Sequence, residues 1–379
     1  MKIDKKNWNT YRFDEFAENI SQRVEPQNTD LSIYVGLEHL DPDSLHIKRH
    51  GSPSDVEGTK LKFYKGDVIF GKRRAYQRKA ALAEYDGICS AHAMVLRAKT
   101  DIIDERLFPF FFHSTIFQTR AIDISVGGLS PTINWKDLAK QEFSLPPKEE
   151  QARLAELLWA ADEVVERERK LLNEISTTIY SFINEIFSKQ YHFKNLGKLC
   201  EVKSGFGFPI EYQGNISSTY PFFKVSDMNH SENQVYLSYS ENYVNDDVLK
   251  KIKAKTYPPL SIVFPKIGAT IYTDKKRLLF SESIVDNNIM VLIPNKDKVD
   301  NLFLYYYLLT IKLSTLINAG AIPSISAETV KNILIPCPEI NKQKEISDQI
   351  GVFFKKQDMV KNRIILSQQL KSSLINQIF

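Results

Sequence analysis

The sequence has little of what marks a secreted, metal-binding or membrane-spanning protein. Only three of its 379 residues are cysteine, and Cys89, Cys200 and Cys337 lie far apart, so no pair has metal-ligand spacing. A chain of this length does not need disulfides, and we expect free thiols in a reducing cytoplasm. Residues 1–6 lack the apolar core of a signal peptide. The most apolar window, residues 302–311, is too short to cross a bilayer.

The sequence also lacks the motifs that carry common reactions. It contains no P-loop, no Rossmann fingerprint, no His-Glu-x-x-His metal motif and no Gly-x-Ser-x-Gly nucleophile elbow. It has no Asn/Asp-Pro-Pro-Tyr/Phe tetrapeptide of the kind that amino-methyltransferases use, because Pro258 and Pro259 follow Lys-Thr-Tyr. We therefore expect no catalytic residues, no metal site and no cofactor on this chain.

The overall composition is that of an ordinary globular protein. It is 43% apolar and 25% charged, and its length predicts two or three domains. The formal net charge of +4 is compatible with nucleic-acid binding without arguing for it. Whether the chain binds nucleic acid therefore has to be judged from where its charges lie along the sequence.

What the chain does have is a repeat that ends in two long heptad segments. Residues 151–187 and 343–379 align without a gap, and apolar residues in the first recur at alternating steps of four and three, as in a coiled-coil helix. Glu168 is the one polar break in the first seam. The second seam is interrupted at Gln357, Ser367 and Lys371. Each helix would be about 55 Å long. Each is apolar along one stripe only, so its simplest partner is the other; the alternative is a pair of ordinary core helices.

The blocks that precede these helices repeat as well. Residues 94–96 and 290–292 are the same Met-Val-Leu triplet, and the aromatic runs 110–112 and 305–307 occupy matching places, which are more typical of a helix core than of base stacking. In the first block the pattern predicts a short amphipathic element at 12–20, strands at 31–37, 68–70 and 93–96, and a helix at 107–122. In the second it predicts an opening element at 196–202 and strands at 222–225, 262–264 and 289–292.

The densest basic segment, residues 60–79, predicts a contact with nucleic acid. It holds eight cations against one acid, Asp67. Cations bind phosphates, and Arg and Gln can also read base edges in a groove. The alternative is a solvated basic hairpin. The predicted contacts are Lys72, Arg73, Arg74, Tyr76, Gln77, Arg78 and Lys79.

The matching segment of the second block, residues 265–277, again combines cations with Thr and Tyr. The predicted contacts are Lys266, Thr270, Tyr272, Lys275 and Lys276, with Ser204 and Phe206 as weaker additions. The latter two lie in a glycine-rich loop, residues 203–208, whose backbone amides could approach a phosphate closely. His92 and Asn288 occupy matching positions before a strand, and we interpret both as structural hydrogen-bonding residues.

Four segments make the chain resemble a known family. They are residues 66–79, 86–97, the closing Leu-Pro-Pro-Lys-Glu-Glu-Gln at 145–151, and its second copy at 335–343, which has two extra residues before the Gln. Together with the full-length repeat, they resemble the DNA-specificity subunits of type I restriction–modification systems. The departures are a less basic second loop and the interrupted second seam.

The resemblance implies an α+β fold: two similar α/β target-recognition domains separated by two long helices packed as an antiparallel coiled coil with pseudo-two-fold symmetry. The expected boundaries are 1–147 for the first recognition domain, 148–190 for the central helix, 191–337 for the second recognition domain and 338–379 for the C-terminal helix. The helices would set the spacing between the two recognition domains.

The resemblance also implies a function. Each recognition domain would bind one half of an asymmetric, bipartite double-stranded DNA site in the cytoplasm. Two methyltransferase subunits, which carry S-adenosylmethionine, would dock on the chain, and restriction/translocase subunits would join them. Rival hypotheses are an enzyme in its own right, a stand-alone DNA-binding regulator that is not an enzyme, and a protein scaffold without DNA.

Overall fold

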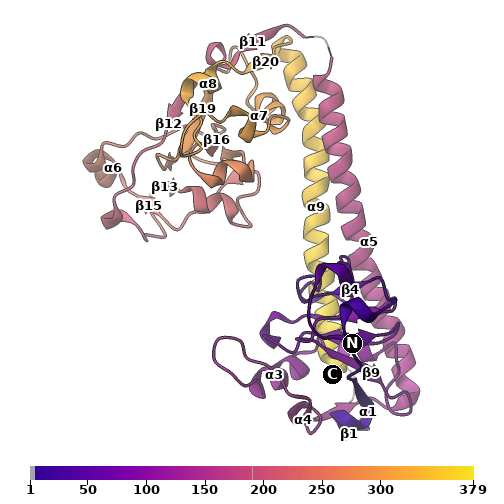
Figure 1. The fold of residues 1–379 in the computed structure, drawn as a ribbon. Helices are drawn as coiled ribbons and strands as arrows, with labels where there is room; N and C mark the ends of the chain where they lie inside the picture. The colour runs from indigo at the N-terminus through magenta and orange to yellow at the C-terminus, as the bar shows by residue number, and fades with distance from the viewer. Residues whose placement is uncertain (1–4, 190) are drawn as a thin grey trace. The chain divides into compact units, whose positions relative to one another are not determined.

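The computed structural model describes residues 5–189 and 191–379, which form two compact units. Unit 1 contains the chain up to Leu171 together with Val360–Phe379, and unit 2 is Leu172–Met359. The boundaries fall inside the two long helices, so each unit contains one end of each helix (Figure 1).

Unit 1 is a mixed α/β block built on three small sheets. Its strands are β1 (Asn9–Arg12), β2 (Ala17–Ile20), β3 (Arg23–Val24), β4 (Tyr34–Val35), β5 (Lys60–Phe63), β6 (Val68–Phe70), β7 (Ala80–Leu82), β8 (Gly87–Cys89), β9 (Met94–Ala98) and β10 (Glu142–Leu145). Its helices are α1 (Phe13–Phe16), α2 (Phe108–Phe111), α3 (Thr115–Asp123), α4 (Trp135–Leu138), the first part of α5 (Lys148–Phe187) and the last part of α9 (Ile340–Ile378). The strand orders are β2-β9-β6-β7, β3-β5-β8-β4 and β1-β10.

Three sequence predictions in unit 1 were wrong in extent. The element at 12–20 is one turn of helix followed by strand β2, because the chain becomes extended at Ala17. The strand at 31–37 shrinks to β4, which pairs with the three-residue strand β8 and, through Tyr34, with Gly51. The helix at 107–122 is two helices, since Ser114 is extended and its side chain accepts a hydrogen bond from the Phe117 amide, which starts α3.

Phenylalanine side chains form the centre of unit 1. The predicted core position of residues 110–112 is confirmed, because all three side chains are fully buried. The Phe111 ring packs edge-on against Phe143 from β10 at 4.9 Å and against Phe379 at 5.3 Å, measured between ring centroids. Such edge-to-face pairs each contribute about 0.5–1.5 kcal/mol beyond the area they bury. This core fixes the sheet to the end of α9.

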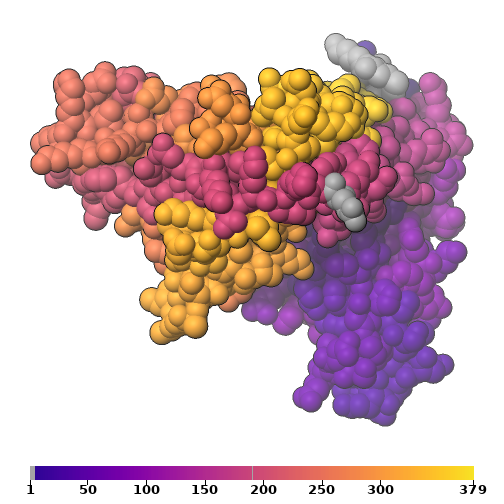
Figure 2. Space-filling model, turned by 90° about the horizontal axis from the view of Figure 1, so that it is seen from above, coloured from indigo at the N-terminus to yellow at the C-terminus, as the bar shows by residue number. Residues whose placement is uncertain are grey.

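Unit 2 repeats this plan with a larger main sheet. Its strands are β11 (Phe193–Asn195), β12 (Cys200–Ser204), β13 (Tyr220–Phe223), β14 (Tyr236–Leu237), β15 (Tyr243–Val244), β16 (Ile262–Pro265), β17 (Arg277–Leu279), β18 (Ile284–Val285), β19 (Ile289–Pro294) and β20 (Leu334–Pro336). Its helices are α6 (Asp246–Ile252), α7 (Asn301–Leu309), α8 (Ala327–Lys331), the last part of α5 and the first part of α9. The strand orders are β12-β19-β16-β17-β14, β15-β13-β18 and β11-β20. Figure 2 shows one end of this unit, where the pink segment around β11 lies against the yellow residues around β20 and the start of α9.

The two long helices pack antiparallel within each unit, as the sequence predicts. In unit 1 the Lys371 ammonium donates to Asp162 at 2.9 Å, and Ser367 donates to Glu168 at 2.9 Å. The residue numbers rise along α5 as their partners fall along α9, which is the mark of antiparallel helices. Asp162 and Glu168 are both buried, so these pairs lie in the helix seam.

In unit 2 the same alignment continues with neutral groups. Gln357 donates to Ser176 at 2.9 Å, and the Phe182 and Phe353 rings lie 5.0 Å apart between centroids. Each interruption of the second seam therefore has a polar partner on α5. The polar residues that interrupt the apolar stripe of α9 are therefore matched by polar residues of α5.

The registers of the two sheets show which residues of the units are equivalent. Val68 lies opposite Leu96 in unit 1, and Ile262 lies opposite Leu292 in unit 2. This alignment makes Lys72 equivalent to Lys266, and the backbone agrees, because the Ile133 amide donates to the Lys72 carbonyl at 3.0 Å while the Ile325 amide donates to the Lys266 carbonyl at 2.9 Å.

A second register carries the equivalence to the opening strands. Ile20 lies opposite Val95, and Lys203 lies opposite Val291. Counting on from these pairs makes Ser21 equivalent to Ser204, Gln22 to Gly205 and Arg23 to Phe206.

Candidate nucleic-acid interface

The basic loop of unit 1 connects β6 to β7 and is held by its backbone. Arg74 has left-handed backbone angles (φ 57°, ψ 54°), and its amide donates to the Pro131 carbonyl at 2.7 Å. A 3-10 turn, η3 (Ala75–Gln77), follows, with Ala75 buried beneath it. The loop ends at Arg78, which is also left-handed at φ 54°. The outcome is a rigid projection that leaves Tyr76 53% exposed.

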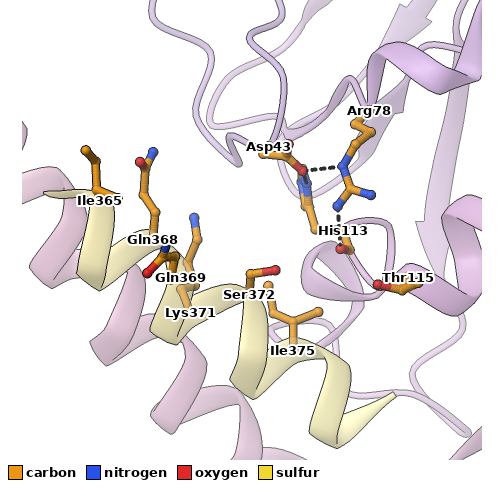
Figure 3. Close-up of a pocket in the computed structure, with 10 residues that line it drawn as sticks. All are labelled: Asp43, Arg78, His113, Thr115, Ile365, Gln368, Gln369, Lys371, Ser372 and Ile375. Atoms are coloured by element: carbon orange, nitrogen blue, oxygen red, sulfur yellow. Dashed lines mark hydrogen bonds and ion pairs between the residues drawn. The ribbon is translucent and has the colours of Figure 1, made fainter. Parts of the chain in front are cut away.

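Two of the predicted contacts brace the loop from inside. Arg78 Nε donates to Asp43 at 2.6 Å, and its Nη2 donates to the His113 carbonyl at 3.1 Å. Lys79 Nζ donates to the Leu37 carbonyl at 2.6 Å. Figure 3 shows Arg78 directed at Asp43 and His113, across a cavity of about 490 Å³ from α9. Arg78 and Lys79 therefore hold the loop in place.

The other predicted contacts of this loop have open or weak engagements. Arg74 donates to the Ser130 hydroxyl at 3.1 and 3.2 Å, and Arg73 Nη1 lies 3.3 Å from His92 Nε2. Within the described ranges, the side chains of Lys72, Tyr76 and Gln77 have no hydrogen-bond partner. The loop thus presents cationic side chains, the Gln77 amide and the Tyr76 hydroxyl as hydrogen-bond donors that a ligand could use.

A hairpin between α3 and α4 supports the loop. Residues 126–132 form it, closed by backbone hydrogen bonds between Val126 and Thr132 at 3.1 and 2.9 Å. Thr132 is also bridged to Arg73 in the basic loop. Leu129 at the hairpin tip is 96% exposed. The hairpin and the loop form one surface. In the sequence, Gly127, Gly128 and Pro131 indicate a turn here but not a hairpin.

Unit 2 builds the same loop on the same anchors. Gly268 takes the place of Arg74, with φ 78°, and its amide donates to the Pro323 carbonyl at 2.8 Å. The 3-10 turn η7 (Ala269–Thr273) leaves Tyr272 61% exposed. A matching hairpin, residues 318–324, carries Ile322 with 66% exposure.

The predicted contacts of unit 2 divide into available and engaged side chains. Thr270 donates to the Ile267 carbonyl at 2.9 Å and stays exposed, like Tyr272. Lys266 Nζ donates to the Ser204 hydroxyl at 2.8 Å, and Lys275 Nζ donates to the Asn229 side chain. These exposed or half-exposed groups remain candidates.

Lys276 is a candidate that the structure argues against. Its side chain is only 2% exposed, and its ammonium forms an ion pair with Asp274 at 2.8 Å. Burial lowers the pKa of Lys276, while Asp274 opposes that shift. A duplex could not reach this ammonium in the present conformation, because it is buried against Asp274 at the end of the loop.

Two amides of the glycine-rich loop, which the sequence predicts could approach a phosphate, are already engaged by backbone carbonyls. The Gly205 amide donates to the Ile289 carbonyl at 3.1 Å, and the half-buried Phe206 donates its amide to the Val285 carbonyl at 2.8 Å. A Cβ at Gly205 would lie 2.1 Å from the Asp286 carbonyl oxygen. The glycine is required for close packing of two backbones.

His92 and Asn288 accept similar backbone hydrogen bonds, which fits their interpretation as structural residues. The His92 carbonyl accepts from the Arg73 amide at 3.3 Å, and the Asn288 carbonyl accepts from the Lys266 amide at 2.9 Å. Burial lowers the pKa of the His92 imidazole, and the cations Arg73, Lys72 and Lys60 lower it further. The potential around the first loop is therefore positive.

The described residues also bear on metal binding, membrane insertion and thiol chemistry. Within residues 5–189 and 191–379, no cluster of three or more His, Cys, Asp and Glu side chains could hold a metal ion. Among the same residues, no helix is both long and apolar enough to span a membrane. The three cysteines are free thiols, as predicted, and burial raises the pKa of Cys89 to about 12.

Comparison with known proteins decides the family. The family model of the type I restriction modification DNA specificity domain matches residues 5–177 and, a second time, residues 188–367. The chain belongs to this family. Each unit of this specificity chain thus corresponds mainly to one of the two matches, and DNA recognition is what the family is described by.

Individual relatives are distant. The type I restriction enzyme EcoDI specificity subunit of Escherichia coli is 28% identical over 192 residues, which are 49% of the specificity chain and 41% of that protein. The match therefore spans less than half of the EcoDI subunit. The MjaIX specificity subunit of Methanocaldococcus jannaschii is 22% identical over 300 residues, covering 73% of this chain and 68% of that protein.

Solved structures share the fold. The type I restriction-modification S subunit from M. genitalium aligns with a TM-score of 0.56 at 16% identity, over 100% of the specificity chain and 98% of that chain. A structure described as the basis of complex assembly and conformational transition of the type I R-M system aligns with a TM-score of 0.60 at 17% identity, over 98% and 97%. The α+β fold with two similar units is confirmed by these likenesses.

Proposed function

We propose that the specificity chain reads a bipartite DNA site, with unit 1 binding one half-site and unit 2 the other. The observation that carries this proposal is the pair of equivalent loops. Both leave the central sheet at the same register, both turn at a positive φ, and both donate that residue's amide to a proline carbonyl, Pro131 or Pro323. Two loops with the same backbone anchors and different exposed side chains suit two domains that bind different DNA sequences.

The differences between the loops predict that the half-sites differ. Arg73 and Arg74 in unit 1 are matched by Ile267 and Gly268 in unit 2. An arginine can bind the O6 and N7 of a guanine in the major groove, whereas Ile and Gly cannot donate hydrogen bonds to a base from their side chains. The proposed site is therefore asymmetric, and unit 1 makes the more cationic contact.

The specificity chain would act through partners and would not itself catalyse. Methyltransferase subunits carrying S-adenosylmethionine would dock on it, and restriction/translocase subunits would complete the assembly. Large apolar side chains stay exposed on the long helices, among them Leu366 and Leu370 in unit 1 and Val352 in unit 2. Exposed apolar patches of this kind mark interaction surfaces, and they support helix faces as the docking sites.

The test is methylation in a cell. The specificity chain is expressed with its methyltransferase partner in a host free of such systems, and methylated adenines are mapped across the genome. One bipartite motif should appear. Exchanging residues 72–78 for the loop of an unrelated family member should change one half of the motif and leave the other half unchanged.

Three outcomes would overturn the proposal. They are no motif in the partner's presence, methylation by the pure chain alone, and a change in both half-sites on exchanging one loop. Failure to co-purify with any methyltransferase, together with site-specific binding, would favour the stand-alone regulator.

A further inference from the structure

A cationic cavity lies beside the basic loop of unit 1. It measures about 320 Å³. Its walls come from the end of β2, the start of β3, the start of β5, the start of the basic loop, the segment before β9, and the chain between the supporting hairpin and α4. Arg23, Lys60 and Lys72 line it together with the hydroxyl residues Ser21, Thr59 and Thr132. No Asp or Glu is among the lining residues.

Two of the three cations have no hydrogen-bond partner for their side chains. Lys60 Nζ donates to the Glu57 and Gly58 carbonyls, so its donors are satisfied by backbone oxygens. The side chains of Arg23 and Lys72 make no hydrogen bond or ion pair within the described ranges. Burial lowers the pKa of Lys72, and the charge of Arg23 lowers it further. Two cations held near each other without an anion are mutually unfavourable, and a bound anion would relieve that repulsion.

The surroundings favour an anion with several oxygens. Hydroxyl groups can donate to phosphate oxygens without adding charge, and the arginine fork can bind two phosphate oxygens at once. Lys72 directly precedes Arg73, and Thr132 is bridged to Arg73, so the cavity opens beside the loop that is proposed to face DNA. A duplex on that loop would bring a regular row of phosphates past the cavity.

We propose that Arg23 and Lys72 bind one backbone phosphate of the DNA half-site in this cavity. This inference rests on the proposed function of unit 1 and adds a contact far from the loop in sequence. Phosphate contacts of this kind set the register and orientation of a protein on the duplex without reading a base.

Unit 2 lacks this site, which makes the contact specific to unit 1. Phe206 takes the place of Arg23, and the equivalent lysine, Lys266, donates to Ser204 at 2.8 Å. A nearby carboxylate, Asp286, raises the pKa of Lys266 against the effect of burial. One cation with a hydroxyl partner and a carboxylate nearby has much less need of an anion.

The first experiment compares Arg23→Gln with Arg153→Gln in the full chain, using a duplex that carries the methylated motif. Arg153 is an exposed arginine on α5 of the same unit, outside the loop and the cavity. We expect Arg23→Gln to weaken binding roughly tenfold for related and unrelated sequences alike, and to reduce the slope of log K against log salt by about one. Arg23→Lys keeps the charge and should retain most of the slope.

The second experiment locates the phosphate. Duplexes with a single neutral methylphosphonate at each position of the half-site are bound by wild type and by Arg23→Gln. One position should weaken binding of the wild type and have little effect on the variant, while the other positions weaken both equally. Melting temperatures of the two chains should agree within about 2 °C, which separates the contact from folding.

A third arm separates DNA from a free anion. Inorganic phosphate is titrated into the full chain by calorimetry. Phosphate binding that Arg23→Gln abolishes, with unchanged DNA affinity and unchanged salt slope, would overturn the proposal in favour of a free anion. Equal affinities and slopes for Arg23→Gln and Arg153→Gln would also overturn it, while sequence-specific binding by the wild type would leave the proposed function standing.

Discussion

The two units share backbone contacts and differ in side chains. Their loops are anchored by matching hydrogen bonds, 2.7 Å to Pro131 in unit 1 and 2.8 Å to Pro323 in unit 2. On this frame Arg74 is replaced by Gly268 and Arg23 by Phe206. Because backbone hydrogen bonds carry the geometry, the side chains are free to serve the ligand. Two readers can therefore diverge without loss of the fold.

The helix ends show the opposite kind of difference. In unit 1 buried charges bridge α5 and α9, as in the pair of Asp162 and Lys371. In unit 2 the bridging groups are neutral or aromatic, as in the pair of Ser176 and Gln357. Substitutions in the helix pair should therefore lower the free energy of unfolding more in unit 1 than in unit 2.

The largest effect is expected at Lys371. Replacing it with Ala leaves the buried Asp162 carboxylate without its ammonium partner, and removing one partner of a buried ion pair costs about 3–5 kcal/mol of unfolding free energy. His46 remains beside Asp162, which favours the lower end of that range. Gln357→Ala in unit 2 removes a neutral hydrogen bond and should cost about 0.5–1.5 kcal/mol. Urea unfolding measures both, and equal losses would contradict the contrast.

A smaller loss is expected at Gly205. In Gly205→Ala the new methyl group would meet the Asp286 carbonyl, and overpacking of this kind costs about 1–3 kcal/mol. At the equivalent position of unit 1, Gln22 already carries a long side chain that accepts an exposed hydrogen bond from the Tyr64 hydroxyl at 2.9 Å, so Gln22→Ala should cost about 0.5 kcal/mol, the low end for a lost hydrogen bond. Thermal unfolding decides between them, and a neutral Gly205→Ala would disprove the close approach.

The third contrast concerns DNA and leaves stability aside. Arg74→Gly gives unit 1 the residue of unit 2 at a left-handed position, where Gly is favoured, and this offsets the loss of the exposed hydrogen bonds to Ser130, so stability should change little. We expect about tenfold weaker binding to duplexes with the unit 1 half-site, or about 1.4 kcal/mol. Gly268 adopts φ 78° and ψ −168°, a region restricted to glycine, so the counterpart in unit 2 is Tyr272→Ala, which removes an exposed loop side chain and should alter only the other half-site. Fluorescence anisotropy with duplexes mutated in either half-site gives the result; a loss spread over unrelated sequences would make Arg74 a phosphate contact.

The smallest effect is a pH dependence confined to unit 1. The hydrogen bond from His46 to Asp162 raises the pKa of the imidazole above its usual 6.5, with Glu166 and Glu84 acting in the same direction. The folded-state pKa thus exceeds the unfolded one, so this stabilisation is fully present below about pH 6.5 and is lost as the pH rises through the folded value. Wild type should lose more stability than His46→Gln between about pH 6 and pH 8. Parallel pH profiles of urea midpoints would rule the effect out.

Much of the architecture could be predicted from the sequence, because the local patterns that indicate strands and helices occur in both halves of the chain. The strand at 68–70 matches β6, and the long helices begin and end within a few residues of their predicted bounds. The opening segment 12–20 and the strand 31–37 failed because their extents depend on partners elsewhere in the sheet. Short apolar runs do not specify those partners.

The candidate site was harder to predict, because a count of charged residues does not show which hydrogen-bond acceptors lie within reach of each cation in the fold. Lys276 is buried against Asp274, and Arg78 is committed to Asp43, although both sit in the basic segments. Arg23 was missed because it lies about fifty residues before the loop, on β3, which pairs with β5 in another sheet from the one that carries the loop.

The anchoring of the loops has a consequence for engineering. Each loop begins beside a proline carbonyl and ends at a residue near φ 54°, Arg78 or Asp274, yet η7 is two residues longer than η3. The same two fixed points thus accept inserts of different length. New specificities could be built by transplanting a short cassette between these points, with the sheet beneath left untouched.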